Sequence, residues 1–483
     1  MVLRNVLRAS ASALALWASA ASAQDKPATE EGAAALAKTL SALFGPSVGG
    51  AGAPVSVKAD GADYAVTADL AALFKGAAAL GVTYDAAALT YRFAEQQDGL
   101  WRASFKGPLS VAAHMPNGTS VMKAGDMDYV ALFDPATQWL RDSTVAIGRQ
   151  TIDVHADALN ETITVATLKM HADAEAGADG SMTTKANETF GATDIKVSVA
   201  PKGKTAPMAF TLSSGGGGAD VVASGLKPDN VLGLWRLLVA NPQRPLLATH
   251  EAELKALLTD FFARAVGFGE TFAFDKVTVH TQAGDATVGK VSGGADVLAS
   301  GADSALGETI VAENLDLSRT MIPPAYLDLA PTSFSFGVKV SGFDVDAAAK
   351  VMIAAIHLSG DGPVVGDDDM AKAMMIVDAS PVVIDLPDSH VTAPKLDLSY
   401  RGQIRLVDGK PQGKVTLLAR HFDATGAAIT ALPGVGADAA QPLALATGLG
   451  KDEGDGALSW EVEVAADGTI SVNGAPMGKL PAK

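Results

Sequence analysis

Two long segments of this chain follow the same order of elements, and this internal repetition most constrains the fold. In the first segment Ser224-Gly225-Leu226 precedes a helical run over 230–240, and in the second Ser341-Gly342-Phe343 precedes one over 346–358. Each run is followed by a second helical segment and by alternating strands, and a shorter third copy begins at Arg420. Repeated units bury their apolar faces by stacking against one another. We therefore expect an architecture built by stacking a unit, not one built around a catalytic cleft.

Outside the helical runs, apolar and polar residues alternate with a period of two. Leu89, Tyr91 and Phe93 show this alternation, and similar segments fill the chain up to the first repeat. A period of two places one face of each strand in the core and the other in water. The pattern is typical of a meander of antiparallel strands. It is preceded by a predicted helix over 30–44, with Thr29 as its N-cap.

Helical spacing of apolar residues predicts the remaining helices. The first repeat has one from Pro228 to Ala240 and one over 244–266, and the second repeat has helices over 345–358 and 367–377. A further helix is predicted over 69–80.

These patterns together predict an α+β, β-dominated fold. We expect an elongated, curved antiparallel sheet with helical pairs packed on one face, built from internal repeats. The predicted divisions are a signal peptide over 1–23, an N-terminal helix plus strand meander over 24–224, a first repeat over 225–340, a second repeat over 341–419, and a shorter third repeat with a C-terminal hairpin over 420–483.

The N-terminus has the three parts of a secretory signal peptide. Arg4 and Arg8 form a basic region, residues 11–20 form a short apolar region, and Ala21-Ser22-Ala23 matches a cleavage site. The apolar run is too short to span a bilayer. We therefore expect export and cleavage after Ala23, which gives a periplasmic protein with no transmembrane segment.

Composition excludes several classes of partner and site. The chain has no cysteine, so disulfides, thiolate zinc sites and iron–sulfur clusters are excluded. Its formal net charge of −17 argues against nucleic acid, which is bound through basic patches. We predict no nucleic-acid partner and no cofactor.

Motifs that would carry catalysis are incomplete. Gly284–Lys290 lacks the Ser or Thr that a phosphate-binding loop requires, because Val291 follows. The run Gly215–Gly218 is not followed by a helix, and we interpret it as a flexible loop. Ser120–Lys123 matches S-x-x-K without the further motifs of that enzyme class, and no histidine pair has metal-ligand spacing. We therefore predict no catalytic, cofactor-binding or metal-binding residues.

The C-terminal motifs resemble those of a known group of bacterial envelope proteins. They are the segment Trp460–Val464, the turn Asp467-Gly468, and Ile470-Ser471-Val472-Asn473-Gly474 followed by Pro476-Met477. Together with Ser341-Gly342-Phe343-Asp344 before a helix, these motifs resemble those of YdgA-like proteins and of a related set of exported proteins of unknown function. Both groups are similar to AsmA-like proteins in the order of their motifs and elements.

This resemblance covers roughly residues 220–478. It implies a long, curved β-sheet structure in the periplasm with no established catalytic residues. The families it resembles usually keep an N-terminal membrane anchor, whereas this chain is predicted to lose its signal at Ala23, so a bridging role does not follow.

The sequence therefore favours a non-enzymatic envelope protein that acts as a scaffold or binds an apolar ligand such as a lipid. A sheet curved around helices can leave a groove that suits acyl chains. The residues expected to line it are Phe272, Phe274, Val382, Ile384, Leu396 and Leu398. Two alternatives remain open. One is a protein-interaction module in envelope assembly whose sheet edges pair with another envelope protein, and the other, least favoured, is a hydrolase with an unrecognised site.

Overall fold

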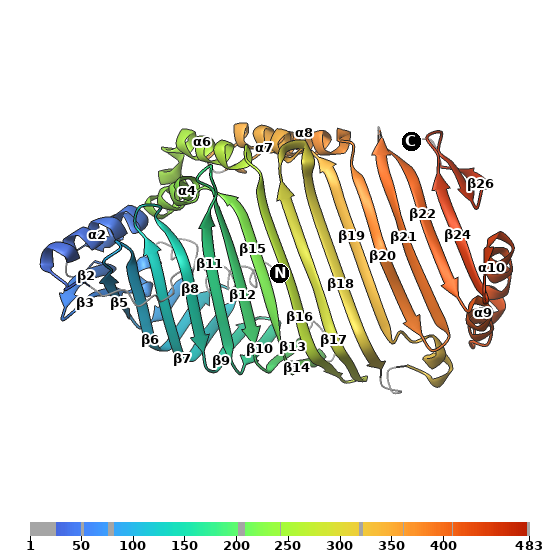
Figure 1. Ribbon diagram of the computed structural model, residues 1–483. Coiled ribbons are helices and arrows are strands. Elements are labelled where there is room, and N and C mark those ends of the chain that lie inside the picture. Colours follow the sequence, from blue (N-terminus) through green and yellow to red (C-terminus); the bar gives the residue numbers. More distant parts are fainter. Residues whose placement is uncertain are drawn as a thin grey trace. The chain divides into compact units, whose positions relative to one another are not determined.

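The computed structural model describes residues 26–49, 53–75, 82–200, 208–241, 243–317, 322–360, 362–407 and 409–480 (Figure 1). The predicted signal peptide, with Ala21 and Ala23 at its cleavage site, lies outside these residues. The chain is β-dominated and its strands form long antiparallel ladders, as the alternation predicts. It divides into two compact units, which are described separately below. The first unit comprises Met1–Ala209, Gly216–Phe261 and Ile353–Gly366, and the second comprises Phe210–Gly215, Phe262–Met352 and Asp367–Lys483.

The strands up to the first group of helices are short or medium in length, apart from β6 and β7. Their bounds are β1 Val48–Gly49, β2 Val55–Asp60, β3 Asp63–Ala68, β4 Thr83–Ala86, β5 Leu89–Glu95, β6 Trp101–Met115, β7 Gly118–Asp134, β8 Trp139–Ile147, β9 Gln150–Ala156, β10 Leu159–Val165, β11 Leu168–Ala176, β12 Met182–Phe190, β13 Thr193–Val199, β14 Met208–Ser214 and β15 Gly216–Leu226.

The later strands are longer on average. Their bounds are β16 Val266–Thr281, β17 Gly284–Ala299, β18 Ser304–Leu317, β19 Ser333–Phe343, β20 Val383–Ala393, β21 Leu396–Val407, β22 Lys410–Arg420, β23 Lys451–Gly454, β24 Ala457–Val464, β25 Thr469–Val472 and β26 Ala475–Lys479.

The described helices range from 4 to 15 residues. They are α2 Glu30–Phe44, α3 Leu70–Leu73, α4 Pro228–Ala240, α5 Arg244–Ala248, α6 Glu251–Phe262, α7 Val345–Ala354, α8 Asp367–Ala379, α9 Phe422–Thr430 and α10 Gly436–Leu449, with 3-10 turns at Gly45–Ser47, Gly301–Asp303 and Pro324–Leu329. The predicted N-cap of α2 is confirmed, because the Thr29 hydroxyl accepts a hydrogen bond of 3.0 Å from the Gly32 N–H.

In the first unit, the long strand β7 pairs with two consecutive shorter strands. One half of β7 pairs with β8 and the other half with β9. Between the two halves, the Gly125 N–H donates to the Arg149 carbonyl at 2.7 Å, and the Gly148 N–H donates to the Asp126 carbonyl at 3.1 Å. The ladder continues from β8 through β11 and β12 to β15, and from β9 through β10 to β13. Hydrogen bonding with β7 is therefore maintained where β8 passes into β9.

In the second unit, β16 to β22 form one antiparallel meander, in which each strand pairs with the next. β24 then pairs with β22, and the short strands β23, β25 and β26 complete the C-terminal end. In Figure 1 these strands lie side by side as a yellow-to-red series. The register therefore fixes which side chains share a face.

The alternation of β16, β17 and β18 is interrupted once in each strand. Lys276 and Asn314 have positive φ angles of 52° and 55°, and the register places Gly289 between them. Positive φ is uncommon for residues other than glycine. In β16 the apolar pattern consequently moves from Phe274 to Val277, three residues apart instead of two.

The principal hydrophobic core lies at the N-terminal end of the first unit. There α2 packs Leu36 and Leu40 against the sheet residues Tyr64, Phe93 and Tyr129, and each of these five side chains is at most 3% exposed. The helix approaches closely because a glycine side chain leaves room where Gly32 meets the Tyr64 hydroxyl. Burial of this kind is the main favourable term in folding.

A second, smaller cluster in the first unit fixes the segment that follows α7. Arg244 donates three hydrogen bonds, to the carbonyls of His357 and Leu358 at 3.0 Å each and of Gly362 at 2.6 Å. The Glu251 carboxylate accepts one of 2.8 Å from the Leu358 N–H. Leu358 itself packs with Leu237, and the segment is thereby held by both polar and apolar contacts.

Four predictions of secondary structure are wrong in detail. The helix predicted over 244–266 is broken at Thr249-His250, and residues from Val266 belong to β16. The helix predicted over 345–358 ends at Ala354, because the Leu358 N–H bonds to Glu251 and not to its own helix. Gly216–Gly218 are part of β15, so the glycine run is not a loop. The helix predicted over 69–80 ends at Leu73, and part of that range lies outside the described residues.

Candidate functional site

One face of the second unit's sheet is formed by four parallel rows of side chains. Residues paired across antiparallel strands lie on the same face, and so do residues two apart along a strand. The first row is Phe268, Val297, Leu306, Val340, Ile384 and Ile404; the second is Glu270, Ala295, Glu308 and Val338; the third is Phe272, Gly293, Ile310 and Phe336; the fourth is Phe274, Val291, Ala312, Phe334, Val391 and Leu398. We call these four rows the apolar face.

Large side chains on the apolar face remain exposed to solvent. The exposed fractions are Phe268 44%, Val297 42%, Leu306 42%, Ile310 42%, Phe336 39% and Val338 38%. A fully packed strand face would bury such residues almost completely, as the N-terminal core does. Contiguous exposed apolar surface makes this face a candidate site for an apolar ligand, a membrane or another protein.

The opposite face of the same strands is mainly polar, although Leu298 is 38% exposed on it. One of its rows is Gly269, Asp296, Gly307, Lys339, Asp385 and Gln403. Another is Ala273, Ser292, Val311, Ser335, His390 and Ser399. Many of its charged groups are paired. Gln403 donates to Asp385 at 2.6 Å, and Arg420 lies 3.2 Å from Asp397. The sheet is therefore two-sided, with solvent on the polar side.

The structure places all six residues of the predicted groove on one side of this sheet. Phe272, Phe274, Ile384 and Leu398 are members of the rows. Val382 directly precedes β20 two residues before Ile384, and Leu396 begins β21 two residues before Leu398. Phe272 and Phe274 are adjacent, with ring centroids 6.1 Å apart. Ile384, Leu396 and Leu398 lie on β20 and β21, and β17, β18 and β19 lie between these strands and β16, which carries the phenylalanines.

Sequence reasoning missed the centre of the apolar face. β18 and β19 were not identified as strands, although Leu306 and Ile310 on β18 and Phe334, Phe336 and Val338 on β19 are the residues that complete the rows. The strict alternation from Phe334 to Val340 is the signal that could have found β19.

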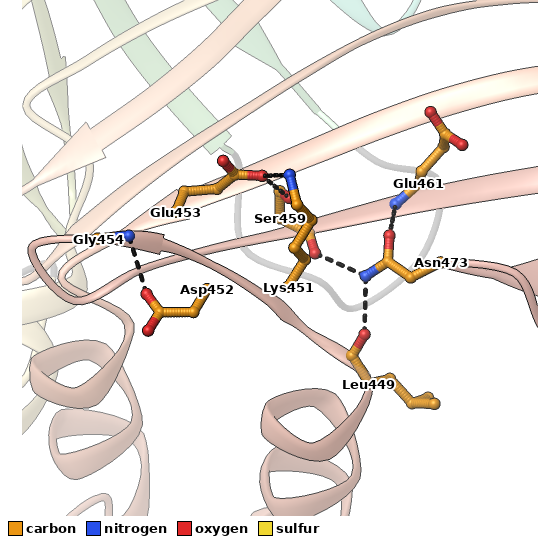
Figure 2. A network of polar contacts seen from close by, with 8 residues as sticks. All are labelled: Leu449, Lys451, Asp452, Glu453, Gly454, Ser459, Glu461 and Asn473. Carbon is orange, nitrogen blue, oxygen red and sulfur yellow. Dashed lines mark hydrogen bonds and ion pairs between the residues drawn. The ribbon is translucent and has the colours of Figure 1, made fainter.

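The C-terminal motif has a structural role. Asn473 has φ 48° and Gly474 φ 78°, the backbone of a tight hairpin turn between β25 and β26. The Asn473 side-chain N–H2 donates to the Leu449 carbonyl at 2.8 Å and the Ser459 carbonyl at 2.9 Å, and its Oδ1 accepts from the Glu461 N–H at 2.8 Å (Figure 2). This one side chain thus connects the end of α10, β24 and the C-terminal hairpin.

The nearby turn at Asp467-Gly468 is likewise structural. Asp467 forms an ion pair of 2.7 Å with Lys479 and accepts from the Thr469 N–H at 2.9 Å. These hydrogen bonds, first that of Lys479 and then those of Thr469, hold the pKa of Asp467 well below its usual range. A carboxylate held in this way caps a turn and is poorly suited to proton transfer.

The described residues contain little that could support catalysis. Across the described ranges, no group of three or more His, Asp and Glu side chains could hold a metal ion. An open hollow of about 670 Å³ lies among residues of β20 to β24, but its Arg420 and Asp397 are paired with each other, as are its Arg401 and Asp388 at 3.7 Å. The segment from Gly284, which matches a phosphate-binding loop only incompletely, is part of strand β17 and opens no helix.

None of the helices in the described part of the chain is both long and apolar enough to cross a membrane. Comparison of the chain with protein-family models, with curated proteins and with solved structures finds no match. The apolar face is therefore the feature of the second unit on which a functional argument can be built.

Proposed function

We propose that this chain is a non-enzymatic protein of the bacterial periplasm that binds the acyl chains of a lipid on its apolar face. The observation that carries the proposal is the continuous exposure of large apolar side chains along Phe268, Leu306, Ile310 and Phe336. A ligand that covered this surface would be stabilised by about 25 cal/mol for each Å² of apolar area removed from water. The N-terminal signal pattern supports the periplasmic location.

The length of the rows fits an acyl chain. The first and fourth rows each cross six strands, and five strand spacings of about 4.8 Å give about 24 Å. One leaflet of a bilayer contributes about half of a hydrocarbon core of roughly 30 Å. A membrane acyl chain therefore fits along a row with its whole length against the protein.

The interior of the ladder favours a hydrocarbon over a peptide strand. The backbone N–H and C=O groups of β17 and β18 are used in pairing with strands on both sides, and β19 pairs with β18 and, except at residues 336–338, with β20. A bound peptide strand would find no backbone partner there and would leave its own polar groups unsatisfied. A hydrocarbon has no such groups, which is why we commit to an acyl chain as the occupant.

The repeat predicted from the sequence supports an extended binding surface. α4 to α6 follow β15, and α7 and α8 follow β19, so each Ser-Gly motif ends a strand that leads into helices. We propose that these are two copies of one unit, and that the resemblance to YdgA-like and AsmA-like envelope proteins reflects the same manner of construction. A stacked unit lengthens an apolar face without adding a catalytic centre.

The test is binding of a fluorescent acyl-chain probe such as N-phenyl-1-naphthylamine to residues 24–483. The variant Ile310→Gln/Phe336→Gln places two amides on the apolar face, and its matched control, Thr309→Gln/Ser335→Gln, places them on the polar face of the same strands. We expect the first variant to weaken binding at least tenfold and the control to bind within about twofold of the parent.

Equal loss in both variants, or no loss in either, would refute the apolar face as the site. A second experiment is native mass spectrometry with lipid extraction on the mature chain purified from its own envelope. A co-purifying lipid at about one per chain is the expected result, and a ligand-free monomer that also fails to bind the probe would refute the carrier function.

A further inference from the structure

We infer that the lipid bound on the apolar face carries a positively charged amine, and that lipids whose polar end is only anionic are rejected. This inference rests on the proposed function and names the ligand class of the same site. It starts from the charge of the face itself. The rows contain two charged side chains, Glu270 and Glu308, and no Lys or Arg.

The two carboxylates lie in one row with a small side chain between them. Glu270 pairs with Ala295, and Ala295 pairs with Glu308. Their strands are two spacings apart, about 10 Å. Since alanine fills little of that interval, both long side chains can converge on a group placed above Ala295.

Apolar residues border this row on both sides. The row above contains Phe268 and Leu306, and the row below contains Phe272 and Ile310. The Phe272 ring lies over Gly293, since a side-chain carbon added at that glycine would be 2.9 Å from the ring. An ammonium above Ala295 would therefore have carboxylates at its sides and an aromatic ring close by, both of which attract cations.

Neither carboxylate is paired with another side chain in the described part of the chain. Glu270 and Glu308 have no hydrogen bond or ion pair there, whereas Asp385 and Asp397 on the polar face have partners. An acyl chain laid along the rows would remove water from both carboxylates. Burying an unpaired charge is costly, and a cation supplied by the ligand offsets that cost, whereas an anion adds repulsion.

A competing explanation is that the two glutamates only keep an open apolar sheet soluble. Inward-pointing charges are a known device against aggregation of exposed strands. That explanation predicts no preference among ligands of the same chain length. Charge selectivity therefore separates the two explanations.

The experiment is calorimetric titration of residues 24–483 with three single-chain amphiphiles below their micelle concentrations: dodecyltrimethylammonium, neutral dodecyl maltoside and dodecyl sulfate. We expect the cation to bind at least tenfold more tightly than the sulfate, with the maltoside between them. In Glu270→Gln/Glu308→Gln the cation should lose about tenfold while the maltoside stays within about twofold.

The matched control is Glu313→Gln, which neutralises an exposed carboxylate on the polar side of β18, opposite Lys290. It should leave all three affinities unchanged, and thermal melts should show that each variant folds like the parent. Equal binding of the three amphiphiles, or equal effects of the double variant on all of them, would overturn the inference and leave the proposed function intact. Absence of binding by all three would instead refute the proposed function.

Discussion

The N-terminal end of the first unit and the apolar face of the second are built from the same strand pattern, but among the described residues a helix covers only the first. At the N-terminal end, α2 lies on the sheet and Leu36, Tyr64 and Tyr129 are at most 2% exposed. On the apolar face, Phe268 and Ile310 are 44% and 42% exposed. Alternation creates an apolar side in both regions, and a packed helix turns only one of them into a core.

This difference in exposure allows effects on the stability of the fold to be separated from effects on ligand binding. A covered residue contributes to folding through burial and close packing. An uncovered residue keeps a larger part of its surface in water, 44% for Phe268 and 42% for Ile310, and that part is available to a ligand. Substitutions in the two regions should therefore affect different measurements.

The largest expected effect is in the covered region. Leu36→Ala should lower the free energy of unfolding by about 2–5 kcal/mol, because it leaves a cavity beneath α2. Urea unfolding followed by tryptophan fluorescence measures this change. Ile310→Ala is the control on the apolar face and should cost less than about 1 kcal/mol. An equal loss of unfolding free energy in Leu36→Ala and Ile310→Ala would contradict the distinction between the covered region and the apolar face.

Alkaline pH should also act on the covered region. Burial raises the pKa of the Tyr91 hydroxyl to about 12, and burial followed by the charge of Tyr91 raises the pKa of Tyr129 well above its ordinary value. Because the unfolded phenol ionises near pH 10, the stabilisation is complete below pH 10 and is lost as pH rises towards 12. The shift at Tyr91 corresponds to about 2–3 kcal/mol.

Urea midpoints measured between pH 9 and 12 would test this prediction. Tyr91→Phe should flatten the decline, since phenylalanine cannot ionise. An identical pH dependence in the parent and in Tyr91→Phe would contradict the assignment.

An intermediate effect is expected at the C-terminal hairpin, which polar contacts hold in place of a buried core. Asn473→Ala removes three side-chain hydrogen bonds and places alanine at φ 48°. We expect a local loss of about 1–3 kcal/mol, seen as faster hydrogen exchange in β24 and β25. Asn473→Gly keeps the backbone conformation and should lose less, so that the two variants separate the turn from the hydrogen bonds.

The smallest effect on stability should come with the largest effect on binding. Phe336→Gln on the apolar face should change the free energy of unfolding by less than about 1 kcal/mol, because the side chain is 39% exposed. In the presence of saturating probe, however, the parent should gain stability and the variant should not. Thermal melts with and without probe measure both quantities, and an equal gain in the two proteins would contradict binding at this face.

Local signals in the sequence predicted local structure well. The N-cap at Thr29 and the start of α4 at Pro228 are confirmed. Each depends on residues within one turn of each other, where capping and the fixed φ of proline act directly. The glycine run was misinterpreted because Gly216–Gly218 continue a strand whose partner, β12, is contributed by an earlier part of the chain.

The candidate site was predictable only in part. Alternation identified Phe272 and Ile384 as apolar strand positions, and both belong to the apolar face. It could not show that they are joined through β17, β18 and β19, because the register between strands depends on pairing along the whole meander. Nor could it show Glu270 and Glu308 in one row, since they are 38 residues apart in the chain.

By itself, the sequence determined that this chain forms two-sided antiparallel strands, carries no cysteine and has a strong negative charge. These properties follow from residue type and spacing alone. Only the tertiary structure decided which apolar side is covered, since that depends on where α2 packs and on the absence, among the described residues, of a comparable core over Phe268 and Ile310. Burial is a property of contacts between distant segments, and a pattern along the chain cannot specify it.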